Sequence, residues 1–168
     1  MKKFIVGLLV LGLTSHVFAQ VTEVEQLSEV VVMAVNYKYL NSMDNSEAAI
    51  PVQMLERKAA AFNVQEQEYY TDEYDYYTVS FFIPDGKIVA VYDTDGKIMR
   101  TIENFEDTKL PKDVNKALTQ RFPNWELVSD VYRVTYSESK GANKTYKLKL
   151  KNGDKTMRVK MNEKGEFL

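Results

Sequence analysis

The segment YTVSFFIPDGKIVAVYD, residues 77–93, is the clearest indication of how this chain folds. Two runs rich in β-branched and aromatic residues, 77–83 and 87–93, flank Pro84-Asp85-Gly86. Such runs are typical of strands, and an Asp-Gly pair is typical of a hairpin turn whose glycine has a positive φ. We therefore predict an antiparallel hairpin over residues 77–93.

The same pattern returns near the C-terminus. Runs 146–151 and 155–161 flank Asn152-Gly153, which predicts a second hairpin. A longer strand is expected at 131–136. Further turns are expected at three glycine-containing pairs: Asp95-Gly96, Lys140-Gly141 and Lys164-Gly165.

A helical pattern precedes each hairpin, over 50–62 and 110–122. Each begins with an apolar residue and a proline, which is tolerated in a first helical turn because its missing N–H has no partner there. The apolar residues recur at helical spacing and are core candidates: Val52, Leu55, Ala59 and Phe62, then Val114, Ala117, Leu118 and Phe122. In the second pattern, Pro123 ends the helix.

These elements predict an α+β protein built as tandem repeats, 50–109 and 110–168. Each repeat is expected to pack one helix on an antiparallel sheet of about four strands. The Val- and Tyr-rich run 29–40 predicts an extra N-terminal strand, and 41–49 a loop.

Residues 1–19 have the pattern of a cleavable signal peptide. Lys2 and Lys3 precede the apolar run 4–13, and Ala19 ends the segment. An apolar run this short does not span a bilayer, which needs about 20 residues. We predict cleavage near Ala19 and a periplasmic or secreted protein; the alternative is an N-terminal membrane anchor. Because the chain contains no Cys, a lipoprotein is excluded.

Several of these segments together resemble a known family. They are Tyr92–Ile98, Leu110-Pro111, the helix 114–122, the strand 146–150 and the closing Gly165. In this order they are similar to the PepSY-like, beta-lactamase-inhibitor-like family of exported domains, in the versions common in Bacteroidota. The resemblance implies tandem helix-on-sheet units that bind or inhibit a partner, and it brings no catalytic residue and no cofactor.

The composition excludes several chemistries. The chain has no Cys, and its one histidine, His16, lies in the predicted signal. Ser-His or Cys-His catalysis and a zinc site of His or Cys are thus excluded after cleavage. A nicotinate-nucleotide adenylyltransferase activity is likewise unsupported, because there is no His pair, phosphate loop or alternating βαβ pattern. A pair of carboxylates remains as an enzymatic alternative.

One segment resembles the start of a calcium loop, Asp93-Thr94-Asp95-Gly96. A calcium loop continues with ligands at its fifth and twelfth positions. Here those positions are Lys97 and Asn104, so a hairpin turn is favoured and no metal is predicted.

Charge is distributed unevenly. Residues 20–109 contain 7 basic and 17 acidic side chains, and 110–168 contain 13 and 7. Strand alternation places a basic set on the outer face of the second hairpin: Lys147, Lys149, Lys151, Arg158 and Lys160. Few aromatic residues lie among them, so we predict an anionic ligand and no nucleic acid; the alternative is a solvated surface.

In the first hairpin the same alternation points Phe82, Val89 and Val91 outward. An apolar cluster on an outer face is covered by other parts of the chain or by a partner. We therefore expect a non-enzymatic domain that binds or inhibits its partner, which is a protein or an anionic envelope ligand. The alternative is an envelope-associated structural protein; neither is an integral membrane protein.

Overall fold

The computed structural model describes residues 35–43 and 46–168, and the predicted signal and residues 29–34 lie outside these ranges. The described helices are α2 (Tyr37–Met43), α3 (Ile50–Ala60) and α4 (Lys112–Arg121). The strands are β1 (Tyr76–Ile83), β2 (Gly86–Asp93), β3 (Ile98–Glu106), β4 (Glu126–Ser137), β5 (Gly141–Asn152) and β6 (Lys155–Asn162). None of these helices has the length and apolarity needed to cross a membrane.

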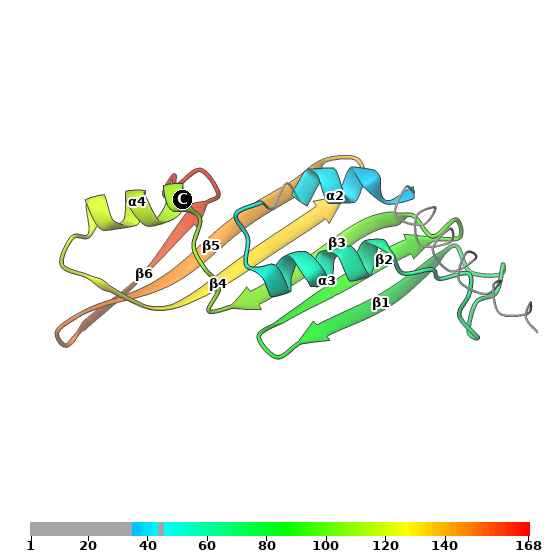
Figure 1. The fold of residues 1–168 in the computed structure, drawn as a ribbon, viewed down its shortest axis with the longest axis horizontal. Helices are drawn as coiled ribbons and strands as arrows, with labels where there is room; N and C mark the ends of the chain where they lie inside the picture. Colours follow the sequence, from blue (N-terminus) through cyan, green and yellow to red (C-terminus); the bar gives the residue numbers. More distant parts are fainter. Residues whose placement is uncertain (1–34, 44–45) are drawn as a thin grey trace, which may run out of the picture.

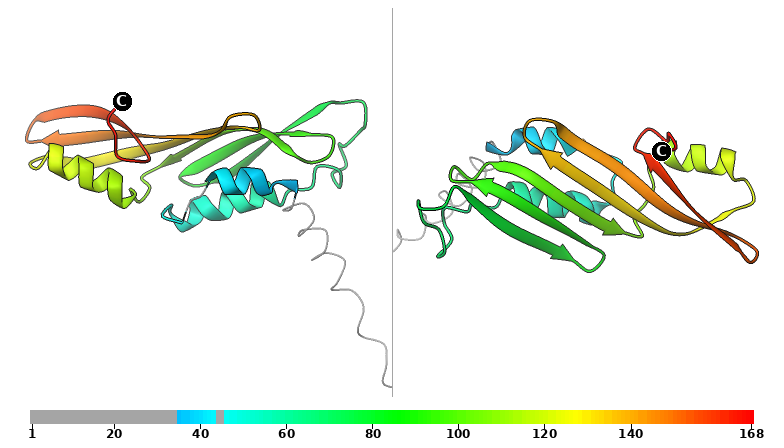
Figure 2. Two further views of the ribbon diagram at one scale, coloured as in Figure 1. Left: turned by 90° about the horizontal axis from the view of Figure 1, so that it is seen from above. Right: turned by 180° about the vertical axis from the view of Figure 1, so that it is seen from behind.

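All six strands form one antiparallel sheet in the order in which they occur along the chain (Figure 1). The three described helices lie on the same side of it, so the molecule has two layers (Figure 2). The expected α+β class with an antiparallel sheet is confirmed.

The number and grouping of strands differ from the prediction. Three strands follow α3 and three follow α4, instead of about four each. β3 pairs with β4 over residues 100–106 and 131–137, which joins the two predicted units into a single sheet. Near the C-terminus a fourth strand is reduced to a single bridge between Met161 and Phe167.

Helix α3 begins at Ile50 as predicted, whereas α4 begins at Lys112, two residues later than predicted, with Pro111 at its N-cap. The buried residues Val52, Leu55 and Ala59 of α3 and Val114 and Leu118 of α4 form the expected apolar stripes. Both phenylalanines beyond the helix ends are half-buried against the core. The Phe62 ring meets Phe81 at 5.4 Å, and the Phe122 ring meets Phe167 at 5.8 Å.

The expected N-terminal strand is wrong where it can be compared. Residues 37–43 form helix α2, so the first residues of the predicted loop, 41–43, are helical as well. The reason lies in the spacing of Tyr39 and Met43, which are four residues apart and both buried. A helix points both toward the sheet, whereas β propensity reports only how well single residues suit a strand.

Just ahead of α2, the buried Asn36 fixes the position of this helix. Its Nδ2 donates to the carbonyls of Ala60 and Gly96, at 3.0 and 3.1 Å. Its Oδ1 accepts from the N–H of Ile98 at 2.7 Å. One side chain thus joins the start of α2 to the end of α3 and to the β2–β3 turn.

Positive φ angles occur at most of the predicted turn glycines: 75° at Gly96, 75° at Gly141, 58° at Gly153 and 79° at Gly165. The Asp93 carboxylate accepts hydrogen bonds from the N–H groups of Asp95 and Lys97 at 3.0 and 2.9 Å, so it serves the turn. The prediction for Gly86 is wrong: its φ is not positive, and it is already the first residue of β2.

Gly86 is required for packing. A Cβ at this position would come within 2.2 Å of Cδ1 of Phe105, which lies opposite on β3. Phe105 in turn lies opposite Tyr132, and Tyr132 opposite Tyr146. The ring centroids of these neighbours are 6.1 and 4.7 Å apart and the rings are stacked. A row of aromatic rings therefore crosses the middle of the sheet, beginning over the glycine.

We predict that Gly86→Ala destabilises the protein by about 1–3 kcal/mol, because the added methyl group overpacks the Phe105 ring. Urea unfolding measures this free energy. The matched control is Gly153→Ala. A Cβ at this position would have no non-neighbouring atom within 4 Å, so only the positive φ opposes the substitution. Phe105→Leu should recover part of the loss from Gly86→Ala but none of the loss from Gly153→Ala. Equal rescue of both would contradict the steric explanation.

Candidate functional site: the open face of the sheet

We call the side of the sheet opposite the helices (Figure 2) the open face. It carries every predicted binding residue, because these residues alternate along their strands with the buried residues of the helix side. The sequence placed these residues in two separate units. Because the six strands form one sheet, their outward side chains share one surface, with the apolar residues on β1 and β2 and the basic residues on β5 and β6.

The predicted basic residues form a strip across the last two strands. Lys147 lies directly opposite Lys160, and Lys149 opposite Arg158. Lys149 is half-buried, and the other four members of the strip are exposed. Within the described residues, none of the five forms an ion pair with a carboxylate. Two like-charged pairs face each other across neighbouring strands, an arrangement that costs stability and favours an anion.

The strip borders a hollow of about 430 Å³ at the β6 edge. Lys147, Arg158 and Lys160 line one side, and Arg121 at the end of α4 lines the other. The Arg121 guanidinium lies 4.5 Å from the centroid of the Phe167 ring, which helps form the apolar lining. Four cationic side chains therefore surround one partly apolar hollow. Arg121 was not predicted as a site residue, because only the tertiary fold brings α4 beside β6.

The predicted apolar residues form a patch at the other side of the open face. Phe82 is 67% exposed, and Val89 and Val91 are half-buried. The patch has a further member, Ile102, which is 48% exposed and lies opposite Val89. Strand alternation could have indicated Ile102, but the pairing of β2 with β3 shifts register between Val91 and Tyr92. Alternation counted from the β2–β3 turn therefore assigns Ile102 to the wrong face.

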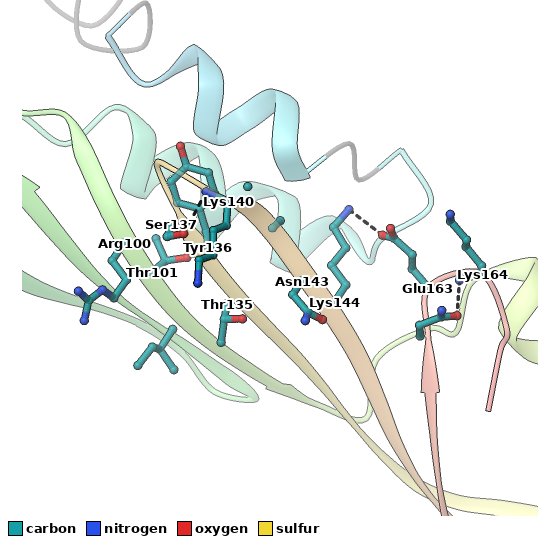
Figure 3. Close-up of a pocket in the computed structure, with 14 residues that line it drawn as sticks. Arg100, Thr101, Thr135, Tyr136, Ser137, Lys140, Asn143, Lys144, Glu163 and Lys164 are labelled. Atoms are coloured by element: carbon teal, nitrogen blue, oxygen red, sulfur yellow. Dashed lines mark hydrogen bonds and ion pairs between the residues drawn. The ribbon is translucent and has the colours of Figure 1, made fainter. Parts of the chain in front are cut away.

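A groove of about 660 Å³ is lined by residues of β3, β4 and β5 and of the turn that follows β6 (Figure 3). Arg100 and Ile102 of β3, Thr135 of β4 and Asn143 of β5 line it. The carboxylate in its lining, Glu163, is 3.1 Å from Nζ of Lys144. No group of three or more His, Cys, Asp or Glu side chains within 35–43 and 46–168 is arranged to hold a metal. The groove offers hydrogen bonding and positive charge.

A buried polar cluster on the helix side of the sheet was not predicted. The Glu103 carboxylate of β3 accepts hydrogen bonds from the Tyr39 hydroxyl of α2 at 3.0 Å and the Thr101 hydroxyl at 2.7 Å. Nearby, Lys144 donates to the Met43 carbonyl at the end of α2. Two polar contacts therefore hold α2 to the sheet, one at Tyr39 and one at the C-terminal residue Met43. Glu103 occupies a core position, where its residue type gave no signal.

Burial raises the pKa of Glu103 to about 7, while the hydrogen bonds from Thr101 and Tyr39 and the charge of Lys144 act to lower it. Its Oε2 has no hydrogen-bond partner among the described residues. Burial also raises the pKa of Tyr39 well above its ordinary value, which keeps its hydroxyl a donor.

Comparison with known proteins adds little. No family model matches the chain, and no curated protein matches it. Among solved structures, a BLIP-like protein from Bacteroides fragilis aligns with 79% of this chain and 82% of its own length, at 11% identity and a TM-score of 0.31. A likeness of this size does not define a common fold, so no property of that protein is transferred to this chain.

Glu103 predicts a specific pH dependence of stability. The pKa of Glu103 is higher in the folded protein than in the unfolded chain. Its stabilising contribution to the free energy of unfolding is therefore fully present below about pH 4.5 and is lost as the pH rises through about 7. Glu103→Gln, which mimics the protonated carboxyl, should remove a loss of roughly 3 kcal/mol over this range. Urea unfolding of both proteins at pH 4.5, 6 and 8 measures it. Parallel pH profiles would show that Glu103 does not titrate there.

Proposed function

We propose that this protein is an exported, non-enzymatic binding domain, and that its open face holds the acidic surface of a partner protein. The observation that supports this most directly is the pairing of Lys147 with Lys160 and of Lys149 with Arg158 across β5 and β6. A surface that served only solubility would mix charges of both signs, because opposed like charges destabilise neighbouring strands.

The apolar patch supports a macromolecular partner. Phe82 and Ile102 lie on the same face as the basic strip but on strands β1 and β3. A small anion would contact the strip alone, whereas a protein can cover both regions. Exposed apolar side chains then contribute most of the affinity, while the lysines orient the partner and accelerate association.

Export and the internal duplication belong to the same proposal. The segment 1–19 has the signal pattern described above, which supports a location in the periplasm or outside the cell. The order of one helix and three strands, α3-β1-β2-β3 and then α4-β4-β5-β6, is consistent with two PepSY-like units. The outer face of the second unit is basic, whereas that of the first is apolar.

The register of β5 and β6 selects the variant that tests this proposal. Lys147→Glu combined with Lys149→Glu places an acid opposite Lys160 and another opposite Arg158. Two like-charged pairs thereby become opposite-charged pairs, so the free energy of unfolding should stay constant or rise by up to about 1 kcal/mol per pair. Retention on a heparin column at low salt, and capture of the partner from an envelope extract, should both be lost.

The matched control is Lys58→Glu combined with Lys116→Glu, which makes the same change in net charge on exposed residues of α3 and α4. This variant should bind as the parent does. Phe82→Ser separates the two parts of the surface, because it should weaken the partner and leave heparin retention unchanged. Equal loss in the two lysine variants would show that net charge alone determines binding.

A further inference from the structure

The two edges of the sheet differ in a way that points to a second interface. β1 forms one edge and, among the described residues, pairs only with β2 (Figure 1). Its eight residues, YYTVSFFI, include no charge and no proline. The backbone groups along such an edge can pair with another strand, and proteins ordinarily protect long apolar edges.

The opposite edge, β6, has that protection. Its sequence includes Lys155, Arg158 and Lys160. The end of the chain also folds back on it, since the Leu168 N–H donates to the Lys160 carbonyl at 2.9 Å and Phe167 bridges to Met161. Within residues 35–43 and 46–168, β1 has neither device, so the described fold protects one edge and leaves the other able to accept a strand.

The hairpin determines which backbone groups of β1 face outward. Pro84 and Asp85 form a two-residue turn, so the flanking pair Ile83 and Gly86 is a hydrogen-bonded pair. Along an antiparallel strand, the backbone N–H and C=O groups of successive residues point alternately to one neighbouring strand and to the other side. The odd-numbered residues of β1 therefore form the hydrogen bonds to β2. The N–H and C=O groups of the even-numbered residues point to the free edge: Tyr76, Thr78, Ser80 and Phe82.

The sequence of β1 is symmetric in chemical type. Residues 76–82 read aromatic, aromatic, hydroxyl, Val79, hydroxyl, aromatic, aromatic. We propose that β1 pairs antiparallel with β1 of a second copy about a two-fold axis at Val79, which forms a dimer with one continuous sheet. Each outward-bonding residue then meets its own chemical type, Thr78 opposite Ser80 and Tyr76 opposite Phe82.

This register satisfies the backbone and the side chains together. With the axis at Val79, the residues paired across the edge are those whose N–H and C=O groups point there. Tyr76 and Phe82 are 60% and 67% exposed in the single chain and become cross-strand aromatic partners. An axis at Ser80 instead places Phe82 opposite Thr78, so the sequence favours the axis at Val79. No charges are opposed, and the same surface of both copies forms the contact, as two-fold symmetry requires.

The dimer would also extend the open face. The two apolar patches meet at its centre, because Phe82 of each copy lies beside the shared edge, while the two basic strips lie at its ends. This inference does not depend on the proposed function, because it rests on β1 and uses no residue of the strip.

Two double variants of the chain, purified as the cell processes it, test the proposal. Thr78→Lys with Ser80→Lys opposes lysines across the two-fold axis, whereas Thr78→Glu with Ser80→Lys opposes acid and base. Thr78 and Ser80 are both exposed, so the thermal unfolding of each variant should report an intact fold. Sedimentation equilibrium measures the dissociation constant of the dimer. This constant should be at least tenfold higher for the first variant than for the parent, and within threefold of the parent for the second.

Hydrogen exchange identifies the contact directly. The amides of Thr78 and Ser80 should be protected in the concentrated parent and should lose that protection on dilution. A parent that stays monomeric up to 200 μM, or a dimer that both variants weaken equally, would overturn the proposal. Fast exchange of the Thr78 and Ser80 amides at every concentration would also overturn the dimer. Pairing of the β1 edge with a strand of a different protein would not restore it.

Discussion

The row of residues that crosses the middle of the sheet holds this molecule together. It passes from Gly86 through Phe105, Tyr132 and Tyr146 to Met161, each lying opposite the next. The contact of Phe105 with Tyr132 lies at the pairing of β3 with β4, where the two halves of the chain meet. Stacked aromatic rings bury large apolar areas and restrict the register of their strands, because a shift of one residue would point them away from the core. The absence of a side chain on Gly86 makes room for the first ring.

The position of the helices follows from this core. One face of the sheet carries the aromatic row and must be covered, and α2, α3 and α4 all pack there (Figure 2). α2 is short, and polar contacts to the sheet hold it in place, through the preceding Asn36, through Tyr39 and through the carbonyl of Met43. Glu103 receives the central one of these contacts at a cost, since burial disfavours its charged form. Covering one face leaves the other open, so the position of the proposed binding surface follows from where the helices lie.

Charge and apolar character are separated across this open face. The first half of the chain places an apolar patch beside the β1 edge, and the second half places cations beside β6. The protected β6 edge and the unprotected β1 edge follow the same division. The lysines that we propose to attract an anionic partner also protect the β6 edge from strand pairing, whereas the uncharged β1 lacks that protection. A single asymmetry along the chain therefore accounts for both proposed interfaces.

The sequence by itself determined the local elements. Proline at the helix starts, apolar residues at helical spacing and glycines at turns predicted α3, α4 and most strands, because these signals act within a few residues. Strand alternation also placed Lys147 and Phe82 outward, as found. The tertiary structure alone decided that β3 pairs with β4, that residues 37–43 form a helix and that Gly86 serves packing instead of a turn. Each of these depends on a partner distant in sequence: Tyr132 for β3, the sheet for Tyr39, and the Phe105 ring for Gly86. Glu103 and Arg121 were missed for the same reason, since burial and proximity arise only when separate elements pack together.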